Sequence, residues 1–270
     1  METPHQGTAL FHLPGLFEFY DLYAAFLPLY RAHREYFYDW CAIGSIYGAP
    51  SDCLWAGGRV EYSDRTPREV LALTREYGIS ARLTLSNSLL RPEHLTDPDC
   101  NALCRLFQEQ NDPQNGAIVH AELLTQYLKK NYPSLYLVSS TTKVLTDFND
   151  LQRELARPEF RYVVPDFRLN RAFDRLAALP QSQKDKVEFL CNECCWFGCT
   201  ERRACYEAVS RKNLGLPGPE HYCSAPGAAG GIASPGRWRT PALSASSHPG
   251  YLPAEGFTQF KIEGRGLAVR

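Results

Sequence analysis

The chain of 270 residues contains no long hydrophobic run and no excess of charge of either sign. A membrane-spanning helix needs about 20 consecutive apolar residues, and no segment reaches that length. The first 30 residues lack a basic start and carry Glu18 and Asp21 within their apolar stretch, so they are not typical of a signal peptide. A net charge of −1 predicts no overall attraction to nucleic acid or anionic lipid. We therefore expect a cytoplasmic protein without a membrane span.

Several catalytic signatures are also missing. The chain has no Gly-rich turn of the kind that binds dinucleotides, no HExxH zinc motif and no persuasive pair of cysteine and histidine for nucleophilic catalysis. What remains is an ordinary globular composition, with 44% hydrophobic and 22% charged residues. The length suits one large domain or two small ones.

A repeating pattern of strands and helices begins after residue 60. Thr66, Pro67 and Glu69 predict a capped helix start, and Gly78 predicts its end. The predicted strands cover 79–85, 116–120, 135–139, 162–165, 187–190 and 257–262, and the predicted helices cover 66–77, 97–110, 121–131, 147–155, 171–178 and 200–212. This alternation predicts a parallel α/β fold, and specifically a (β/α) TIM-type barrel. We count only six or seven strands, which predicts an incomplete or distorted barrel; a flavodoxin-like open sheet is the alternative.

Composition divides the chain into four parts. Residues 1–60 are predicted to hold aromatic-rich N-terminal helices and the first barrel strand; Pro28 is expected to break the helix over 15–38, whose aromatic stripe we interpret as a buried packing face. Residues 61–214 hold the (β/α) units. The Gly/Pro/Ser-rich residues 215–256 predict a long loop or insertion, and residues 257–270 a late barrel strand.

Ligands of parallel α/β folds bind where the strands end, because the following loops meet on one face. The polar residues found just after the predicted strands are Asn87, His120, Glu122, Ser139, Ser140, Thr141, Asp166, Asn170, Asn192 and Glu193. Most of these are expected to cap helices or form turns. His120, close to Glu122, is the candidate with the greatest functional interest.

Six of the ten cysteines lie between residues 191 and 223. Clustered thiols in a reducing compartment more often bind metal than form disulfides. The cluster begins at the end of a strand and runs into a helix, where backbone amides favour thiolate charge. Soft thiolates select zinc or an iron–sulfur cluster, and the irregular spacing favours the cluster. Zinc, or reduced structural cysteines without metal, remain alternatives.

These residues resemble a known family. Residues 187–210 (VEFLCNECCWFGCTERRACYEAVS) are similar to the strand–cysteine–helix motif of the collagenase-like peptidase family U32. Residues 221–226 (HYCSAP) look like the later cysteine of that family, and residues 260–265 (FKIEGR) look like its Lys-Ile-Glu-Gly-Arg signature. The resemblance covers roughly residues 79–265. Residues 262–265 also match an engineered protease site, but the preceding residues are typical of a native strand, so we interpret them as native.

The resemblance implies a barrel and a [4Fe–4S] cluster. It supports Cys195, Cys199 and Cys223 as ligands, with Cys205 as a less secure fourth. Cys53, Cys191 and Cys194 are alternates. Several members look like oxygen-independent hydroxylases that act on ubiquinone precursors or RNA and take oxygen from prephenate.

Three charged residues alternate along the last predicted strand, so that Lys261, Glu263 and Arg265 share a face. On an inward face such charges must pair or bind an anion. A carboxylate substrate would suit Lys261 and Arg265, with Arg59 contributing from an early loop. An exposed edge strand with solvated charges is the alternative.

From these residues we expect His120, Glu193 and Arg265 to be catalytic, and Arg59, Lys261 and Glu263 to bind substrate. The leading hypothesis is an iron–sulfur hydroxylase-like enzyme that modifies a small molecule or an RNA base. The alternatives are a peptidase of unknown catalytic type and a non-enzymatic, cluster-bearing subunit of a heterodimer.

Overall fold

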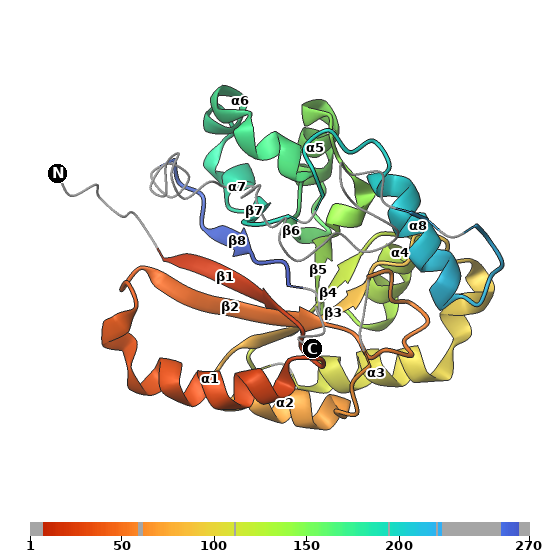
Figure 1. The fold of residues 1–270 in the computed structure, drawn as a ribbon, viewed down its shortest axis with the longest axis horizontal. Coiled ribbons are helices and arrows are strands. Elements are labelled where there is room, and N and C mark those ends of the chain that lie inside the picture. The colour runs from red at the N-terminus through yellow and green to blue at the C-terminus, as the bar shows by residue number, and fades with distance from the viewer. Residues whose placement is uncertain are drawn as a thin grey trace.

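Parallel strands form a nearly closed barrel in the computed structural model, which describes residues 8–58, 62–110, 112–193, 195–219, 221–222 and 255–264 (Figure 1). The strands are β1 (Ala9–Pro14), β2 (Cys41–Gly48), β3 (Ser80–Leu85), β4 (Gly116–Val119), β5 (Tyr136–Ser139), β6 (Phe160–Val163), β7 (Glu188–Leu190) and β8 (Gln259–Lys261). The helices are α1 (Tyr20–Ala32), α2 (Pro67–Glu76), α3 (Pro98–Glu109), α4 (Glu122–Asn131), α5 (Phe148–Leu155), α6 (Phe173–Ala177), α7 (Gln181–Lys184) and α8 (Arg202–Asn213). None of these helices is long and apolar enough to cross a membrane.

The order of the strands is that of a barrel and not of an open sheet. Hydrogen-bonded neighbours run β6-β5-β4-β3-β2-β1-β8-β7, all parallel. The remaining gap between β6 and β7 is bridged where Val163 pairs with Val187, and the Val163 N–H donates to the Lys186 carbonyl at 2.8 Å. The predicted (β/α) TIM-type barrel is therefore confirmed, and the flavodoxin-like alternative is wrong.

Local sequence signals set the helix starts as predicted. Thr66 and Glu69 form a reciprocal cap at α2, because the Thr66 N–H donates to the Glu69 carboxylate at 2.7 Å while the Glu69 N–H donates to the Thr66 hydroxyl at 3.3 Å. At α3 the Cys100 N–H donates to the Asp97 carboxylate at 2.8 Å. Such caps stabilise a helix by about 1 kcal/mol.

The N-terminal region differs from the prediction in its strands. It contains two strands, β1 and β2, and the count of six or seven strands is corrected to eight. Strand β1 lies between β2 and β8. Its sequence, ALFHLP, is nearly all apolar because both of its faces are covered, so the alternation that marks a half-buried strand is absent.

The predicted break at Pro28 is also wrong, since α1 continues through it. Pro28 is exposed, and so is Ala24, whose carbonyl would accept the missing N–H bond; water can therefore satisfy that carbonyl. The aromatic stripe is a packing face as expected, with Leu16 and Tyr23 buried.

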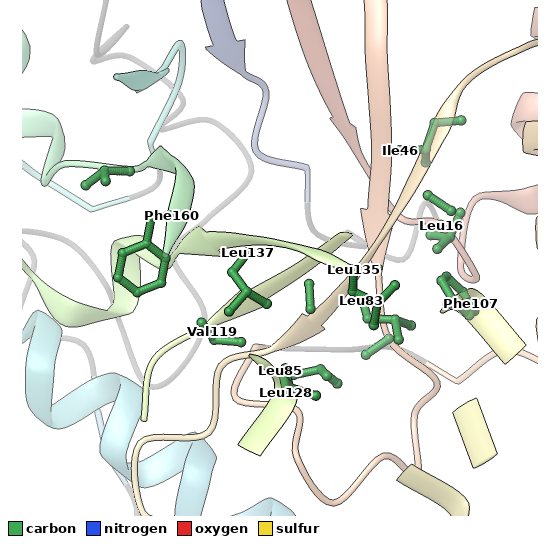
Figure 2. Close-up of a cluster of buried hydrophobic side chains, with 14 of the residues drawn as sticks. Leu16, Ile46, Leu83, Leu85, Phe107, Val119, Leu128, Leu135, Leu137 and Phe160 are labelled. Carbon is green, nitrogen blue, oxygen red and sulfur yellow. The ribbon is translucent and has the colours of Figure 1, made fainter. Parts of the chain in front are cut away.

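The main hydrophobic core lies outside the barrel, between its wall and the surrounding helices. Figure 2 shows part of it. Its labelled members include Leu83, Leu85, Val119, Leu137 and Phe160 from the strands, and Phe107 and Leu128 from the helices α3 and α4. Strand β3 shows the principle: Ala81, Leu83 and Leu85 belong to this core, whereas the alternate residues belong to the barrel interior.

The barrel interior holds a buried ion pair. Arg82 of β3 and Glu188 of β7, 1% and 0% exposed, lie with Nη1 and Oε2 2.6 Å apart. Arg82 Nε also donates to the Tyr136 hydroxyl at 2.7 Å, and its guanidinium lies 4.9 Å from the centre of the Tyr162 ring. The Lys261 ammonium is 3.9 Å from the other Glu188 oxygen.

The electrostatics of this pair keep Glu188 ionised. Burial alone would raise the pKa of its carboxyl, but the positive charge of Arg82 outweighs this, helped by His12 and Lys261, and lowers the pKa to about 2. A buried pair with good geometry and further hydrogen bonds is stable as a unit, and removing one member leaves a buried charge uncompensated.

We therefore expect Glu188→Gln to lower the free energy of unfolding by about 3–5 kcal/mol, because Arg82 and Lys261 would lose their counter-charge. Urea unfolding at pH 7, followed by tryptophan fluorescence, measures the effect. The matched control is Glu76→Gln, which removes a surface pair with Arg31, 3.3 Å apart with both side chains 58% exposed; its loss should stay below about 1 kcal/mol. Equal losses in the two variants would contradict this account of the interior.

Candidate active site at the barrel mouth

A pocket opens at the carboxyl ends of the strands, where the predicted site lies. Its open space amounts to about 620 Å³. The polar side chains that form its walls include Tyr47, Thr84, Ser86, Ser140, Thr141 and Lys261. Tyr206 of α8 lines it too, which brings the helix after the cysteine cluster to the edge of the pocket. Ser140 and Thr141 were both predicted from their positions after β5.

Lys261 links the pocket to the ion pair below it. Its side chain is 4% exposed, and its ammonium lies 3.8 Å from the centre of the Tyr47 ring. The Tyr47 hydroxyl donates to the Ile262 carbonyl at 2.7 Å, which fixes the ring. Glu263, 7% exposed, lies at the mouth beyond Lys261. Both residues thus face inward as predicted, and the exposed edge strand is wrong.

Three pocket-lining residues, Thr84, Ser86 and Thr141, have a buried hydroxyl oxygen without a hydrogen-bond partner in the described part of the chain. Ser86 is 1% exposed and Thr141 is 6% exposed. An unpaired buried hydroxyl costs about 1–3 kcal/mol, so these oxygens are suited to a polar ligand. The segment that carries Gly57 packs closely against the backbone of Ser86. A Cβ on Gly57 would lie 2.1 Å from the Ser86 carbonyl oxygen, so only glycine fits at this position.

His120 lies behind the pocket wall and is joined to it by hydroxyl groups. Its Nδ1 is 2.8 Å from the Thr142 hydroxyl, which donates to the Ser140 hydroxyl at 2.9 Å. Burial, reinforced by the charges of Lys143 and Arg203, lowers the pKa of His120 to about 4, so the ring is neutral at pH 7. Glu122 is not its partner, because that carboxylate pairs with Arg157.

The loop that carries Cys195 and Cys199 is held by a second buried charge network. Arg202, 1% exposed, binds Asp166 at 2.8 Å and also binds Glu193. The other Glu193 oxygen accepts the Cys195 N–H at 3.0 Å. Arg168 joins Asp166 to the Cys199 carbonyl, to which it donates at 2.8 Å. These contacts make Glu193 a loop anchor; its predicted catalytic role stays a prediction.

The cysteines of the predicted metal centre are only partly described. Cys195, Cys199 and Cys205 lie in the described part of the chain, with Cys199 buried and the other two half-buried, whereas Cys194 and Cys223 fall outside it. Within the described ranges, no three or more metal-ligating side chains come together. Cys191 is packed beside the core, and burial raises the pKa of its thiol to about 12, which disfavours the thiolate. The four-cysteine ligand set stays a prediction.

Of three further candidates, the structure describes only Cys53. Cys53, an alternate ligand, lies against Cys100 on the outer side of the barrel, with the two sulfurs 3.7 Å apart. Arg59 and Arg265 fall outside the described residues, so their predicted roles stay open.

Sequence reasoning missed the groups inside the barrel. His12, Arg82 and Glu188 were not singled out. A signal was present in β3, where Ser80, Arg82 and Thr84 alternate with apolar residues, so the inward face is polar.

No family model matches the sequence, and no curated protein matches it. Among solved structures, the chain is similar to that of the U32 peptidase Mk0906, with a TM-score of 0.53 and 14% sequence identity, over 98% of this chain and 96% of that chain. The chain shares the fold of this U32 peptidase. At such low identity the likeness shows the fold alone, and it agrees with the family that the cysteine and Lys-Ile-Glu-Gly-Arg motifs resemble.

The neutral histidine inside the barrel leads to a prediction about pH. Burial and the nearby charge of Arg82 lower the pKa of His12 from 6.5 to about 3. Between these values the unfolded chain binds a proton that the folded chain does not, so the free energy of unfolding should fall as the pH drops below 6.5. The contribution is up to about 1.4 kcal/mol per pH unit.

His12→Gln should reduce the slope of the unfolding free energy against pH by up to about 1.4 kcal/mol per pH unit, which corresponds to one bound proton. The reason is that glutamine can hydrogen-bond to Ser45 and Gln259 without titrating. Urea unfolding at pH 7, 6 and 5 measures the slope. The control is His33→Gln at an exposed histidine. An unchanged slope in His12→Gln would show that His12 does not stay neutral in the fold.

Proposed function

We propose that this chain is an enzyme that binds an anionic small molecule, a carboxylate such as prephenate, at the barrel mouth, and that it acts as an oxygen-independent, iron–sulfur-dependent hydroxylase. The observation that carries the proposal is the buried ammonium of Lys261 in the pocket wall. An ammonium that is removed from bulk water forms strong charge-assisted hydrogen bonds with a carboxylate.

The surroundings of Lys261 support this assignment. Tyr47 and Glu188 hold the side chain from below, while the hydroxyls of Ser86 and Thr141 offer donors on the same pocket. A carboxylate has two oxygens with several acceptor positions, so it can use an ammonium and hydroxyl groups together. Neutral His120 is joined to the pocket wall through the hydroxyls of Thr142 and Ser140, and because Thr142 donates to Ser140, the His120 Nδ1–H donates to Thr142.

Replacing Lys261 should weaken carboxylate binding. Lys261→Met keeps the length of the side chain and removes its charge, and we expect the Kd for prephenate, measured by isothermal titration calorimetry, to rise by about 10- to 100-fold. Arg31→Met, on the surface of α1, is the control and should bind as the unaltered chain does. Thermal unfolding of both variants checks that the fold is kept. Equal affinity in Lys261→Met and the control would refute a role for Lys261 in binding.

The cofactor part of the proposal rests on the chemistry of the donors. Thiols are the ligands that iron–sulfur clusters use, and Cys195, Cys199 and Cys205 lie within 11 positions of one another on the loop after β7 and the start of α8. Their loop is held by Arg168, which donates to the Cys199 carbonyl, and by Arg202, which binds Glu193. With Cys223 they would hold a [4Fe–4S] cluster, which supplies single-electron transfer; zinc is the alternative metal.

Metal analysis tests the cofactor directly. Anaerobically purified chain should contain about four iron and four acid-labile sulfide per molecule, with visible absorbance. Cys195→Ala and Cys199→Ala should each lose most of the iron and the absorbance. Cys41→Ala is the matched control, because Cys41 begins β2 at the amino end of the barrel, and it should keep both. Stoichiometric zinc, or no metal, would remove the hydroxylase hypothesis and leave the binding of the carboxylate to stand alone.

A further inference from the structure

Two buried thiols from distant parts of the chain lie together on the outer side of the barrel. Cys53 belongs to the connection between β2 and α2, and Cys100 to the first turn of α3. Their sulfurs are 3.7 Å apart, and the residues are 8% and 2% exposed. A disulfide requires a sulfur separation of about 2.05 Å, so a small approach of the two side chains would suffice for a bond.

Both thiols line a broad surface groove. Its open space amounts to about 1630 Å³, and its walls come from residues 50–53, 62–68 and 97–109. A low-molecular-weight disulfide can therefore approach Cys53, the more exposed of the two at 8%, from this groove. Cys104, one turn further along α3, is 0% exposed and does not line the groove. Helix α3 therefore carries one cysteine that lines the groove, Cys100, and one that does not, Cys104. Cys104 provides a control within the same helix.

The connection that carries Cys53 forms a turn at the rim of the core. The Cys53 N–H donates to the Pro50 carbonyl at 3.2 Å, closing a turn whose central residues, Ser51 and Asp52, are exposed. Cys100 is fixed by comparison, because its N–H is held by the Asp97 cap.

We propose that Cys53 and Cys100 form a thiol-oxidation site that exchanges with low-molecular-weight disulfides to give an intramolecular disulfide. The Cys53 thiolate attacks one sulfur of the small disulfide, forming a mixed disulfide and releasing one thiolate. Cys100 then gives up its proton and attacks the Cys53 sulfur, which releases the second. The two protein thiols are oxidised, the small disulfide is reduced to two thiols, and the two protons pass to them.

The local electrostatics assign the order of attack. The hydrogen bond between the two thiols lowers the pKa of Cys53, and the backbone around Trp55 and Ala56 adds to the effect. The same interaction, with burial, raises the pKa of Cys100. Cys53 is also the more exposed of the two residues, at 8% against 2%, so we assign it as the nucleophile, and Cys100 resolves the mixed disulfide.

A disulfide between Cys53 and Cys100 would restrain a segment that supports the barrel mouth. The Asn87 N–H donates to the Trp55 carbonyl at 3.0 Å, and its side chain donates to the Ala56 carbonyl at 3.3 Å. Gly57 packs on the backbone of Ser86, which lines the mouth pocket. A bond from Cys53 to α3 would therefore tether the segment that supports one wall of the pocket.

Disulfide mapping of the full chain tests the proposal without reference to any enzymatic activity. Reduced protein is incubated with increasing oxidised glutathione, the remaining thiols are blocked with N-ethylmaleimide, and peptides are identified by mass spectrometry. We expect a linked peptide that joins Cys53 to Cys100, formed in the folded protein and lost with dithiothreitol. Its absence at every ratio, or its formation only in urea, would overturn the proposal.

Variants separate the two steps. In Cys100→Ser the glutathione adduct should accumulate on Cys53, in Cys53→Ser Cys100 should stay unmodified, and in Cys104→Ser the link should form as in the unaltered chain. An adduct on Cys100 in Cys53→Ser, equal to that on Cys53 in Cys100→Ser, would contradict the order of attack. Circular dichroism checks the fold of each variant, and the mapping of the unaltered chain decides the main point should a variant fail to fold.

Discussion

The ion pair between Arg82 and Glu188 is the constraint on which the interior of this barrel depends. Two charges that are fully removed from water are tolerated only when the surrounding groups compensate them, and here a phenol hydroxyl and a second cation contribute. Tyr136 accepts from Arg82, and Lys261 stands near the second Glu188 oxygen. The apolar core is correspondingly displaced to the outside of the barrel wall, between strands and helices.

The mouth is an extension of the same network. Lys261 is shared, since its ammonium belongs both to the Glu188 environment and to the pocket wall. A second network, centred on Arg202, holds the cysteine loop beside that pocket. Rigid anchoring of both the Lys261 side and the cysteine side of the pocket suits the proposed function, because the groups of a catalytic centre must not reorganise during a reaction.

Local signals made much of the fold predictable. The reciprocal cap of Thr66 and Glu69 and the alternation of β3 depend on neighbours in sequence, and both were correctly interpreted. Strand β1 was missed because its burial on both faces erases alternation. An inward face for Lys261 was one of two interpretations of its strand position, whereas its neighbour Glu188 was not singled out, because partners such as Arg82 and Glu188 lie 106 positions apart. The contact between Cys53 and Cys100 was not foreseen for the same reason, since the two are 47 residues apart; the role of Cys53 as an alternate ligand stays a prediction.

The position of β1 between β2 and β8 bears on how the chain folds during synthesis. The His12 side chain of β1 is hydrogen-bonded to the Gln259 side chain of β8, 247 residues further along. Strand β1 therefore lacks one neighbour until β8 has left the ribosome. The early strands can pair in sequence, but the barrel closes only with this long-range contact, which carries a large loop-closure entropy. Until then the charged interior stays hydrated and the edges of β1 and β7 stay open, the state in which a nascent barrel is most exposed to aggregation and most dependent on chaperones.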